Sequence, residues 1–391
     1  MHIVQIHTRY YPHLDGVGST IRAISRELVS NGHRVTVLCS KITPSEPLAE
    51  TIEGVDVRRV PTSGRISDTE LPLTLPKVLA GVVSEADVLH THLPTPWTAD
   101  VSAVLGAVTN TPVVLTYHND LVGTGIQDIL AKTYNRTALQ ATLRLVDKIL
   151  ITQPDYLGDS AHLAPFESKV ETVYNGVDID FFQPTAASSL PEGDFPSGSS
   201  MIFFLALLDE NHTYKGLDVL LKAIGEIARR EDNVPHLFVG GDGGLKPEYE
   251  AMARQLEITD HVTFLGRVPE SDLPTYYSLA DTFVLPSLSS AQEGFGLVLL
   301  EALACGTPVI ATPVVGIADD IRAEPIGTLV PKNDPEKLAS AIRKMIAGQI
   351  SVESERMTSL CENKYSWSSS VAELEDIYQA LVEANDTGIF S

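Results

Sequence analysis

The sequence predicts an α/β protein built from two doubly wound domains, each with its own parallel sheet. Short apolar segments with the length of strands recur along the 391 residues, and stretches with an apolar stripe at helical spacing lie between them. This alternation is typical of βαβ units, in which helices cover both faces of a parallel sheet. A segment rich in Pro, Gly and Ser at 183–200 interrupts the alternation, which indicates a linker between two domains.

The first series of elements predicts a Rossmann-like domain over 1–182. Its opening βαβ unit consists of a strand over 2–7, a loop over 8–18, a helix over 19–31 and a strand over 35–39. The helix carries its apolar stripe on Ile21, Ile24 and Leu28. Later strands are expected at 87–90, 113–117 and 148–151.

The second series predicts another Rossmann-like domain over 201–367. We expect its strands at 201–208, 236–240, 262–265, 282–285 and 308–311. A final helix at about 368–384 has no further strand to pack against, although it carries an apolar stripe formed by Val371, Leu374, Ile377, Tyr378 and Leu381. We therefore expect the segment 368–391 to cross back to the first domain.

The composition indicates an acidic globular protein. Hydrophobic residues make up 43% of the chain and charged residues 20%, which suits two domains with full cores. The formal net charge of −23 disfavours binding to nucleic acid, because phosphate backbones require clustered Lys and Arg.

The same inspection bears on location and on redox chemistry. We find no basic leader and no run of eighteen apolar residues, so we expect a cytoplasmic protein. Cys39, Cys305 and Cys361 are isolated from one another and from His clusters. We expect three reduced core cysteines, and neither a disulfide nor a metal site.

The segment that begins at Glu293 carries the strongest chemical signal. It starts Glu293-Gly294-Phe295-Gly296-Leu297, continues as an apolar helix, and has a second acid, Glu301, eight residues after the first. Glycines at a helix N-terminus allow an anion such as a diphosphate to approach backbone N–H groups. Eight residues span ~12 Å at helical rise, so one carboxylate could accept hydrogen bonds from sugar hydroxyls and the other from a ribose.

Two further candidates stand at the ends of predicted elements. Lys215 precedes Gly216 and a helix of the second domain, where a cation would neutralise a departing diphosphate. His118 follows the strand at 113–117, and ligands of open parallel sheets bind at the carboxyl ends of strands.

The first βα loop contains Gly16, Val17 and Gly18, and it raises the alternative of a dinucleotide site. The third glycine of that fingerprint is missing, and the strand that ends near Ser40 is not followed by an acid for a ribose. The loop is therefore predicted to meet another ligand.

Taken together, these motifs resemble glycosyltransferase family 4, whose members have the GT-B fold and retain the anomeric configuration. The resemblance covers nearly the whole chain and rests on His13–Gly18, Asn31–Val37, Tyr117-His118, Asn175–Asp178, Lys215-Gly216, Phe264–Val268 and Glu293–Thr312. It implies two Rossmann-like domains that face each other across a cleft, with the acceptor bound by the first and the nucleotide-sugar donor by the second.

The resemblance also implies a role for each candidate residue. His118, Glu293 and Lys215 would be catalytic, and the donor would be bound at Gly294, Phe295, Gly296, Leu297, Glu301, Arg267 and Val268, with Gly16, Val17 and Gly18 contacting acceptor and phosphate. The implied reaction moves a hexosyl unit from a UDP- or GDP-linked sugar to a sugar, lipid-linked or small-molecule acceptor, with no cofactor. Front-face displacement is favoured over a covalent intermediate, because no acid that could serve as nucleophile is evident opposite Glu293.

The sequence departs from the family pattern at one place. Many relatives have an Arg a few residues before the Lys, whereas 207–214 contains none, so Arg267 and His212 are alternatives for a second phosphate cation. Two other functions remain open, namely an inactive nucleotide-sugar-binding partner and a GT-B epimerase or phosphorylase. A basic helix side formed by Lys132, Arg136, Arg144 and Lys148 could contact anionic lipid at the inner face of the membrane.

Overall fold

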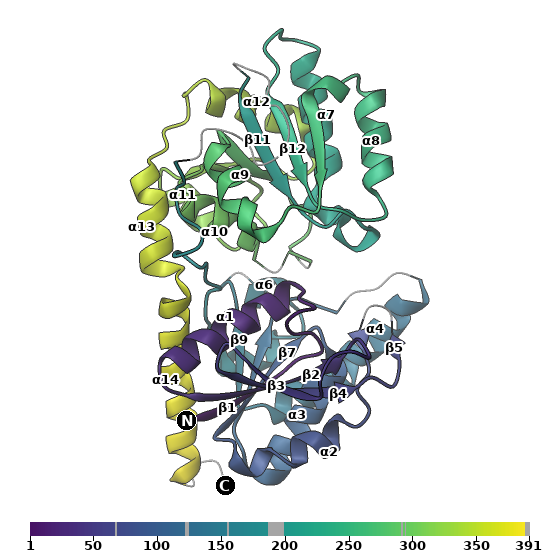
Figure 1. Cartoon of the computed structure of the whole chain (residues 1–391), viewed down its shortest axis with the longest axis vertical. Helices are drawn as coiled ribbons and strands as arrows, with labels where there is room; N and C mark the ends of the chain where they lie inside the picture. Colours follow the sequence, from purple (N-terminus) through teal and green to yellow (C-terminus); the bar gives the residue numbers. More distant parts are fainter. Residues whose placement is uncertain are drawn as a thin grey trace. The chain divides into compact units, whose positions relative to one another are not determined.

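The chain forms two compact units in the computed structural model, which describes residues 1–66, 69–121, 125–154, 156–186, 199–290, 292–293 and 295–387. The first unit joins Met1–Asn175 to Trp367–Ser391, and the second is Gly176–Ser366 (Figure 1). The sequence predicts that the first domain ends at residue 182. The second unit already begins at Gly176, and the Val177 amide donates a hydrogen bond of 2.7 Å to the Tyr365 carbonyl of that unit. Most of the predicted linker, residues 187–198, lies outside the described residues.

The first unit contains an eight-stranded sheet in the order β10-β9-β8-β7-β1-β2-β4-β3. Its strands are β1 His2–Ile6, β2 Arg34–Lys41, β3 Ala49–Ile52, β4 Val55–Pro61, β7 Val88–Leu93, β8 Val113–Tyr117, β9 Lys148–Ile151 and β10 Val170–Thr172. Only β3 runs antiparallel to its neighbour, and a separate hairpin pairs β5 (Arg65–Ile66) with β6 (Thr69–Glu70). The sheet confirms the predicted strands, and it adds β3, β4 and β10.

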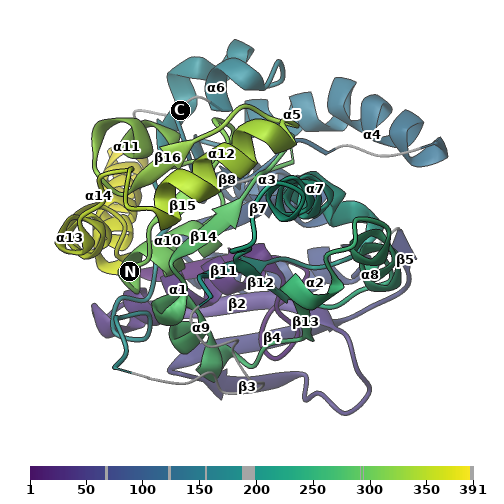
Figure 2. The ribbon, with the colours of Figure 1, turned by 90° about the horizontal axis from the view of Figure 1, so that it is seen from above.

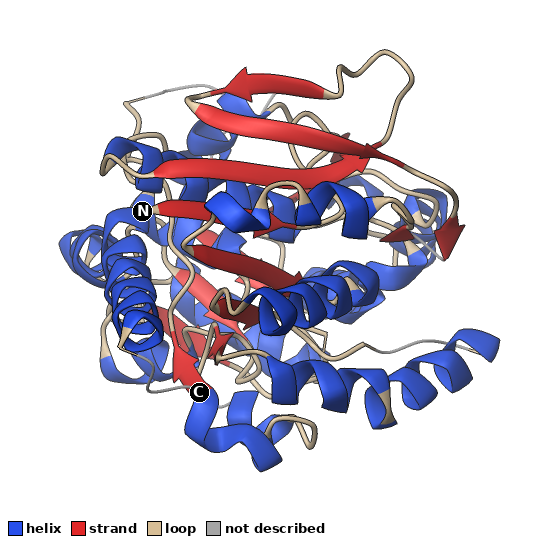
Figure 3. Cartoon of the chain, turned by 90° about the horizontal axis from the view of Figure 1, so that it is seen from below, coloured by secondary structure: helices blue, strands red, loops and turns tan. Residues whose placement is uncertain are grey.

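Helices cover both faces of this sheet (Figure 3). One face carries α1 (Gly16–Ser30) and α14 (Trp367–Asp386). The other carries α2 (Leu75–Ala80), α3 (Pro96–Thr109), α5 (Ala138–Leu145) and α6 (Tyr156–Asp159). Strand residues alternate between the two cores. On β8, Val113 and Leu115 face the α3 side, whereas Val114 faces α1 and α14. The remaining helix is α4 (Ile126–Arg136), and 3₁₀ turns lie at Val83–Glu85 and Ala164–Lys169.

The C-terminal helix α14 belongs to the first unit and lies along it (Figure 1). Its stripe residues Leu374 and Tyr378 are buried in one apolar cluster with Ile21 and Leu28 of α1. The helix therefore closes one of the two cores of the first unit.

Shortening the stripe of α14 should destabilise the protein. Leu374 is 1% exposed, so we expect Leu374→Ala to reduce the free energy of unfolding by about 2 to 5 kcal/mol through lost burial and a cavity. Urea denaturation followed by circular dichroism measures the change. The matched control is Gln379→Ala on the exposed side of the same helix, and equal stability of the two variants would contradict the packing of α14.

The second unit contains a six-stranded parallel sheet in the order β13-β12-β11-β14-β15-β16. Its strands are β11 Met201–Leu205, β12 His236–Gly240, β13 Val262–Gly266, β14 Thr282–Leu285, β15 Val309–Ala311 and β16 Gly327–Leu329. Two groups of helices lie on opposite sides of the sheet (Figure 2). The first is α7 Leu217–Ala228, α8 Lys246–Gln255 and α12 Pro335–Ile346, and the second includes α9 Leu273–Leu279, α10 Leu297–Ala304 and α13 Ser354–Lys364. Helix α11 (Ala318–Ala323) precedes β16, and 3₁₀ turns lie at Glu210–Lys215, Thr259–His261 and Glu270–Asp272.

Two general expectations can be compared with the structure. Cys39, Cys305 and Cys361 are buried and free, as expected. Within the described ranges, the helices are too short or too polar to cross a membrane.

Candidate functional site

The carboxyl ends of β11, β12 and β13 meet at one edge of the second sheet, and the loops that follow them interlock. The Gly241 amide donates a hydrogen bond of 2.7 Å to the Gly266 carbonyl. Gly241 has φ +124°, and a Cβ on it would lie 1.7 Å from the Ala206 carbonyl oxygen. Only glycine fits there, so the sequence Gly240-Gly241-Asp242 is explained by the close approach of two strand ends.

Lys215 and Glu293 form a bidentate ion pair at this edge, 78 residues apart in the chain. Lys215 Nζ donates to both Glu293 carboxylate oxygens at 2.9 Å. The Glu293 side chain is 2% exposed and that of Lys215 is 16% exposed. Lys215 ends the 3₁₀ turn before α7, and Gly216, with φ +78°, turns the chain into that helix. The structure thus brings together two residues that the sequence nominated separately.

Neighbouring side chains hold the pair in place. Ser287 Oγ donates to Glu293 Oε2 at 2.6 Å, and Thr312 Oγ1 donates to the Ser287 carbonyl at 2.5 Å. Lys215 Nζ also lies 5.2 Å from the centroid of the Tyr214 ring, a cation–π distance. Burial lowers the pKa of Lys215, but Glu293 and Tyr214 raise it by more, so the net pKa lies above its ordinary value. Lys215 is therefore a permanent cation at neutral pH.

Glu301 lies on α10 and is paired with a tyrosine. Its Oε2 accepts a hydrogen bond of 2.6 Å from the hydroxyl of Tyr277, which is fully buried. Burial raises the pKa of Glu301 to about 7. The hydrogen bond from Tyr277 lowers this pKa, but by less, and the negative charge of Glu270 raises it further. The carboxyl group is thus poised between its two protonation states near neutral pH.

The N-terminus of α10 presents backbone between the two acids. Gly296, with φ +88°, is its N-cap, and the helix starts at Leu297. The Phe295 side chain is buried against Gly316, whose amide donates a hydrogen bond of 2.9 Å to the Phe295 carbonyl. Leu297 is half-buried. The predicted donor residue Gly294 lies outside the described residues.

The candidates for a second phosphate cation differ in their surroundings. Arg267 follows β13 and is exposed, and Val268 beside it is half-buried. His212 Nδ1 lies 2.7 Å from Asp209 Oδ1, which engages that ring locally. Lys246, at the start of α8, was not considered in the sequence analysis. Its Nζ lies 3.7 Å from the point where a Cβ on Gly266 would stand, so it flanks the same strand ends.

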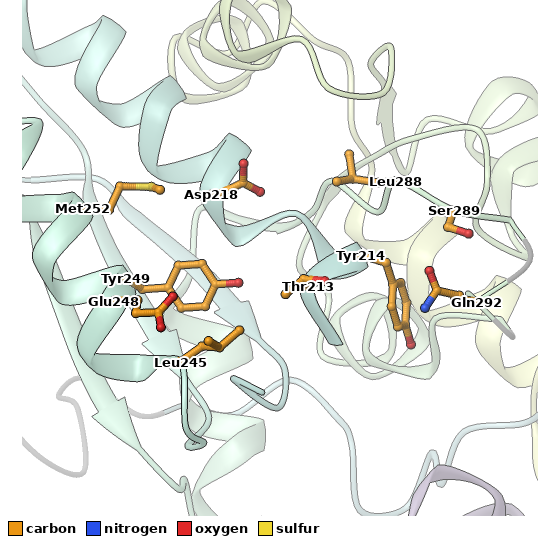
Figure 4. Close-up of a pocket in the computed structure, with 10 residues that line it drawn as sticks. All are labelled: Thr213, Tyr214, Asp218, Leu245, Glu248, Tyr249, Met252, Leu288, Ser289 and Gln292. Atoms are coloured by element: carbon orange, nitrogen blue, oxygen red, sulfur yellow. The ribbon is translucent and has the colours of Figure 1, made fainter. Parts of the chain in front are cut away.

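A cavity of about 480 Å³ is lined in part by chain neighbours of the ion pair (Figure 4). Tyr214 and Gln292, the neighbours of Lys215 and Glu293 in the chain, line one side, and Tyr249 of α8 points its hydroxyl in from the other. The remaining lining residues are Thr213, Asp218, Leu245, Glu248, Met252, Leu288 and Ser289. This lining offers hydroxyl, amide and carboxylate groups and aromatic rings, but no cation, so it suits a neutral polyol better than a phosphate.

His118 belongs to the first unit and lies directly after β8. It is 7% exposed, and its Nε2 lies 3.2 Å from His92 Nδ1. Burial and the nearby His7 lower the pKa of His118 to about 3, despite Asp15. His118 is therefore neutral at physiological pH.

The prediction that Gly16, Val17 and Gly18 lie in a loop is wrong. These residues form the first turn of α1, because Asp15 caps the helix: its Oδ1 accepts a hydrogen bond of 2.7 Å from the Gly18 amide. The amides of Gly16 and Val17 lie at the helix N-terminus, where no intrahelical carbonyl faces them. The site is thus a helix end and not a flexible loop.

Comparison with known proteins identifies the family. A family model described as Glycosyltransferase Family 4 matches residues 14–181, and one described as Glycosyl transferases group 1 matches residues 191–367. The D-rhamnosyltransferase WbpZ of Pseudomonas aeruginosa is 30% identical over 289 residues, which cover 73% of this chain and 71% of that protein. The chain belongs to the family 4 glycosyltransferases.

A further relative agrees with this assignment, and a solved structure shares the fold. The D-inositol 3-phosphate glycosyltransferase 1 of Catenulispora acidiphila is 27% identical over 397 residues, covering 94% of this chain and 91% of that protein. The sucrose-phosphate synthase of Thermosynechococcus elongatus has a TM-score of 0.77 at 23% identity, with 98% of this chain and 99% of that chain covered. The GT-B fold and the glycosyltransferase class predicted from the sequence are confirmed.

Several residues in contact with the candidate site were missed in the sequence analysis. Ser287 and Thr312 stand just after β14 and β15, and polar residues at strand ends are a signal that could have indicated them. Tyr277 and Lys246 lie on helices and carry no such signal, because their role depends on the packing of α9 and α8.

Proposed function

We propose that this glycosyltransferase moves a hexosyl unit from a nucleoside diphosphate sugar, UDP- or GDP-linked, to a hydroxyl acceptor with retention of configuration. The buried Lys215–Glu293 pair beside the α10 N-terminus is the observation that carries the proposal. A cation for a departing diphosphate stands there next to a carboxylate that can accept hydrogen bonds from sugar hydroxyls. The names of relatives support it: one is a D-rhamnosyltransferase, and HepE from Anabaena was solved with UDP-glucose.

The proposed reaction is a front-face displacement. The acceptor oxygen forms a bond to the anomeric carbon while the bond from that carbon to the diphosphate oxygen breaks. The acceptor's proton passes to the departing phosphate, and Lys215 stabilises the charge that develops there. Glu293 and His118 hold sugar hydroxyls, Glu301 holds the ribose, and the backbone near Arg267 and Val268 meets the base.

The first unit is proposed to bind the acceptor, at the α1 N-terminus formed by Gly16 and Val17. The acceptor is a sugar, a lipid-linked sugar or a small molecule such as an inositol phosphate, since named relatives are inositol phosphate glycosyltransferases. No cofactor is proposed, because Lys215 supplies the positive charge at the phosphate. If EDTA abolishes transfer and an added divalent cation restores it, the proposal that no cofactor is needed is contradicted.

A panel of UDP-, GDP- and ADP-sugars in a thermal-shift assay tests the donor site. A donor at a hundred times its Kd should stabilise the native protein by about 2.7 kcal/mol, and Lys215→Ala should abolish the shift. Release of UDP or GDP in the presence of an acceptor then tests transfer. No shift with any nucleotide sugar would refute the donor site, and binding without release across an acceptor panel would indicate an inactive binding partner.

We further propose that the cavity beside Tyr214 holds a sugar ring of one substrate. We expect Tyr249→Ala to raise the KM of that substrate roughly tenfold, since a ring contact of ~1–1.5 kcal/mol is lost, with kcat nearly unchanged. Steady-state kinetics with each substrate varied in turn measures this. Met252→Leu, which keeps the volume of a neighbouring lining residue, is the control. Unchanged KM values for both substrates would show that the cavity is not used.

A peripheral membrane contact is proposed for α4, in a protein of the cytoplasm. The expected single basic helix is wrong: Lys132 and Arg136 lie on α4, Arg144 on α5 and Lys148 on β9, because the helix ends at Arg136. Its exposed surface instead combines these two cations with Ile129 and Leu130, which are 64% and 57% exposed, a pattern typical of an interfacial helix.

The double variant Ile129→Asp, Leu130→Asp should therefore lose on the order of a hundredfold or more in affinity for anionic vesicles, since two buried side chains contribute ~1.5–3 kcal/mol each. Co-sedimentation with phosphatidylglycerol vesicles measures the loss, and phosphatidylcholine vesicles serve as the control. If the parent protein does not sediment with either vesicle, the membrane contact is refuted.

A further inference from the structure

The first unit carries a row of polar side chains across one face of its sheet. Because strand residues alternate, Gln5 of β1, His90 and His92 of β7, and Thr116 of β8 share the face that α1 and α14 cover. His118 follows in the same alternation. Between 0% and 7% of each residue is exposed. Buried polar groups of this kind are costly unless they are hydrogen-bonded to one another.

The row ends at the candidate catalytic histidine. His92 Nε2 lies 2.8 Å from Gln5 Oε1, and His92 Nδ1 lies 3.2 Å from His118 Nε2. The rings of His92 and His118 are stacked, with centroids 5.5 Å apart. Gln5 and His92 thus link His118 to the centre of the sheet.

The other end of the row reaches α14. His90 Nδ1 lies 2.5 Å from the Tyr378 hydroxyl and 3.3 Å from Gln5 Nε2. His90 Nε2 lies 2.7 Å from Thr116 Oγ1. Every polar atom of the Gln5 amide therefore has a partner, and a residue of the C-terminal helix closes the row.

The three imidazoles are neutral. His90 and His92 stack with centroids 4.4 Å apart, which disfavours a charge on either ring. Burial, followed by the neighbouring imidazoles, lowers the pKa of His90 to about 3 and that of His92 well below its ordinary value. A neutral imidazole has one N–H donor and one acceptor nitrogen, so each hydrogen bond determines the next.

The direction of the hydrogen bonds follows from the Gln5 amide. Its oxygen can only accept, so His92 donates from Nε2 and its Nδ1 carries the lone pair. His118 must then donate from Nε2 to His92, which leaves the lone pair of His118 on Nδ1. On the far side, the Gln5 amide nitrogen can only donate, so His90 accepts at Nδ1 and donates from Nε2 to Thr116.

We propose that Gln5 and His92 are positioning residues that hold His118 in the Nε2–H tautomer, with His90 and Tyr378 fixing the orientation of the Gln5 amide. His118 then offers a substrate only the lone pair of Nδ1. It accepts a hydrogen bond from a sugar hydroxyl and has no proton to donate to the reacting atoms. The inference rests on the proposed function in one respect, namely that His118 meets a substrate.

Nitrogen NMR of the full-length chain with ¹⁵N-labelled histidine tests the tautomer directly. The His118 signals are identified by their loss in His118→Gln. We expect Nε2 to be the protonated nitrogen of His118 throughout pH 6–9, without substrate. Protonation at Nδ1, or at both nitrogens, would overturn the inference.

Two variants of His92 separate positioning from simple packing. His92→Leu removes the acceptor, so we expect His118 to lose its single tautomer and kcat to fall on the order of tenfold, with the donor KM within about twofold. His92→Asn keeps an acceptor near the former Nδ1 and should restore the Nε2–H tautomer and most of kcat. Equal losses in both variants with an unchanged tautomer would mean that His92 only fills space.

These experiments distinguish a failure of the positioning role from a failure of the proposed function. If neither variant folds, the spectrum of the parent chain still decides the tautomer. A chain that shows the Nε2–H tautomer but transfers no sugar would refute the proposed function alone. A chain that transfers sugar with His118 protonated on Nδ1 would refute the positioning role alone.

Discussion

Replacing Glu293 with Gln is expected to lower glycosyl transfer by two to three orders of magnitude and the free energy of unfolding by about 3 to 5 kcal/mol. Lys215 would lose the carboxylate that it contacts through two hydrogen bonds of 2.9 Å, and a partly buried cation would be left without its counter-charge. The donor sugar would lose a charged acceptor for its hydroxyl groups and keep only the weaker amide oxygen. Steady-state release of the nucleoside diphosphate and urea denaturation measure the two effects.

A double-mutant cycle separates stability from catalysis. Lys215→Met alone should destabilise the protein by leaving Glu293, 2% exposed, as a buried unpaired charge. In the double variant Lys215→Met, Glu293→Gln both charges are gone, so most of the stability should return while transfer stays at its lowest level. Recovery of activity together with stability would show that the pair only supports the fold.

Glu301→Gln is expected to stabilise the free protein at pH 8 by up to about 3.5 kcal/mol while weakening nucleotide binding. The pKa of Glu301 is raised from 4.5 to about 7 in the folded state, and each pKa unit corresponds to about 1.4 kcal/mol. Between these two pH values the folded state holds more protons than the unfolded state. The free energy of unfolding therefore falls as the pH rises from about 4.5 to about 7, and the full loss of stability is present above pH 7. A neutral amide removes that loss and can still accept a hydrogen bond from Tyr277.

The same group should make nucleotide affinity depend on pH. Ribose hydroxyls donate to the ionised carboxylate, so binding favours loss of the proton, and affinity should rise about tenfold from pH 6 to pH 8 if the pKa in the free protein is about 7. Calorimetry in two buffers with different ionisation enthalpies detects the released proton. Glu301→Gln should show neither the rise nor the release. A pH dependence that survives in Glu301→Gln would assign it to another group.

The strands of both sheets could be predicted because they are buried on both faces and form short apolar runs, as Val113–Tyr117 and Thr282–Leu285 illustrate. The sequence does not predict β3, because Ala49, Glu50 and Thr51 are exposed at the sheet edge, where a strand needs no apolar run. The sequence predicts the start of α1 three residues too late, because Gly16 and Gly18 favour loops unless a cap such as Asp15 holds the turn.

The candidate site residues are nominated one by one from the sequence, but their arrangement is not. Lys215 and Glu293 were each indicated by their motifs, yet their contact depends on how the loops after β11 and β14 pack. Tyr277 and the raised pKa of Glu301 follow from burial between α9 and α10, which no local pattern encodes. The row from Tyr378 to His118 joins residues from both ends of the chain, and spacing alone cannot show such a contact.

The place of α14 in the first unit has a consequence for biosynthesis. A ribosome completes Met1–Asn175 and then the whole of Gly176–Ser366 before Trp367 and the helix emerge. At roughly 5–20 residues per second this delay is on the order of ten seconds or more. During that time the apolar surface around Ile21 and Leu28 lacks its cover, and the first unit reaches its final packing only after the second unit has been synthesised. A nascent or prematurely terminated chain should therefore be a preferred client of chaperones and proteases.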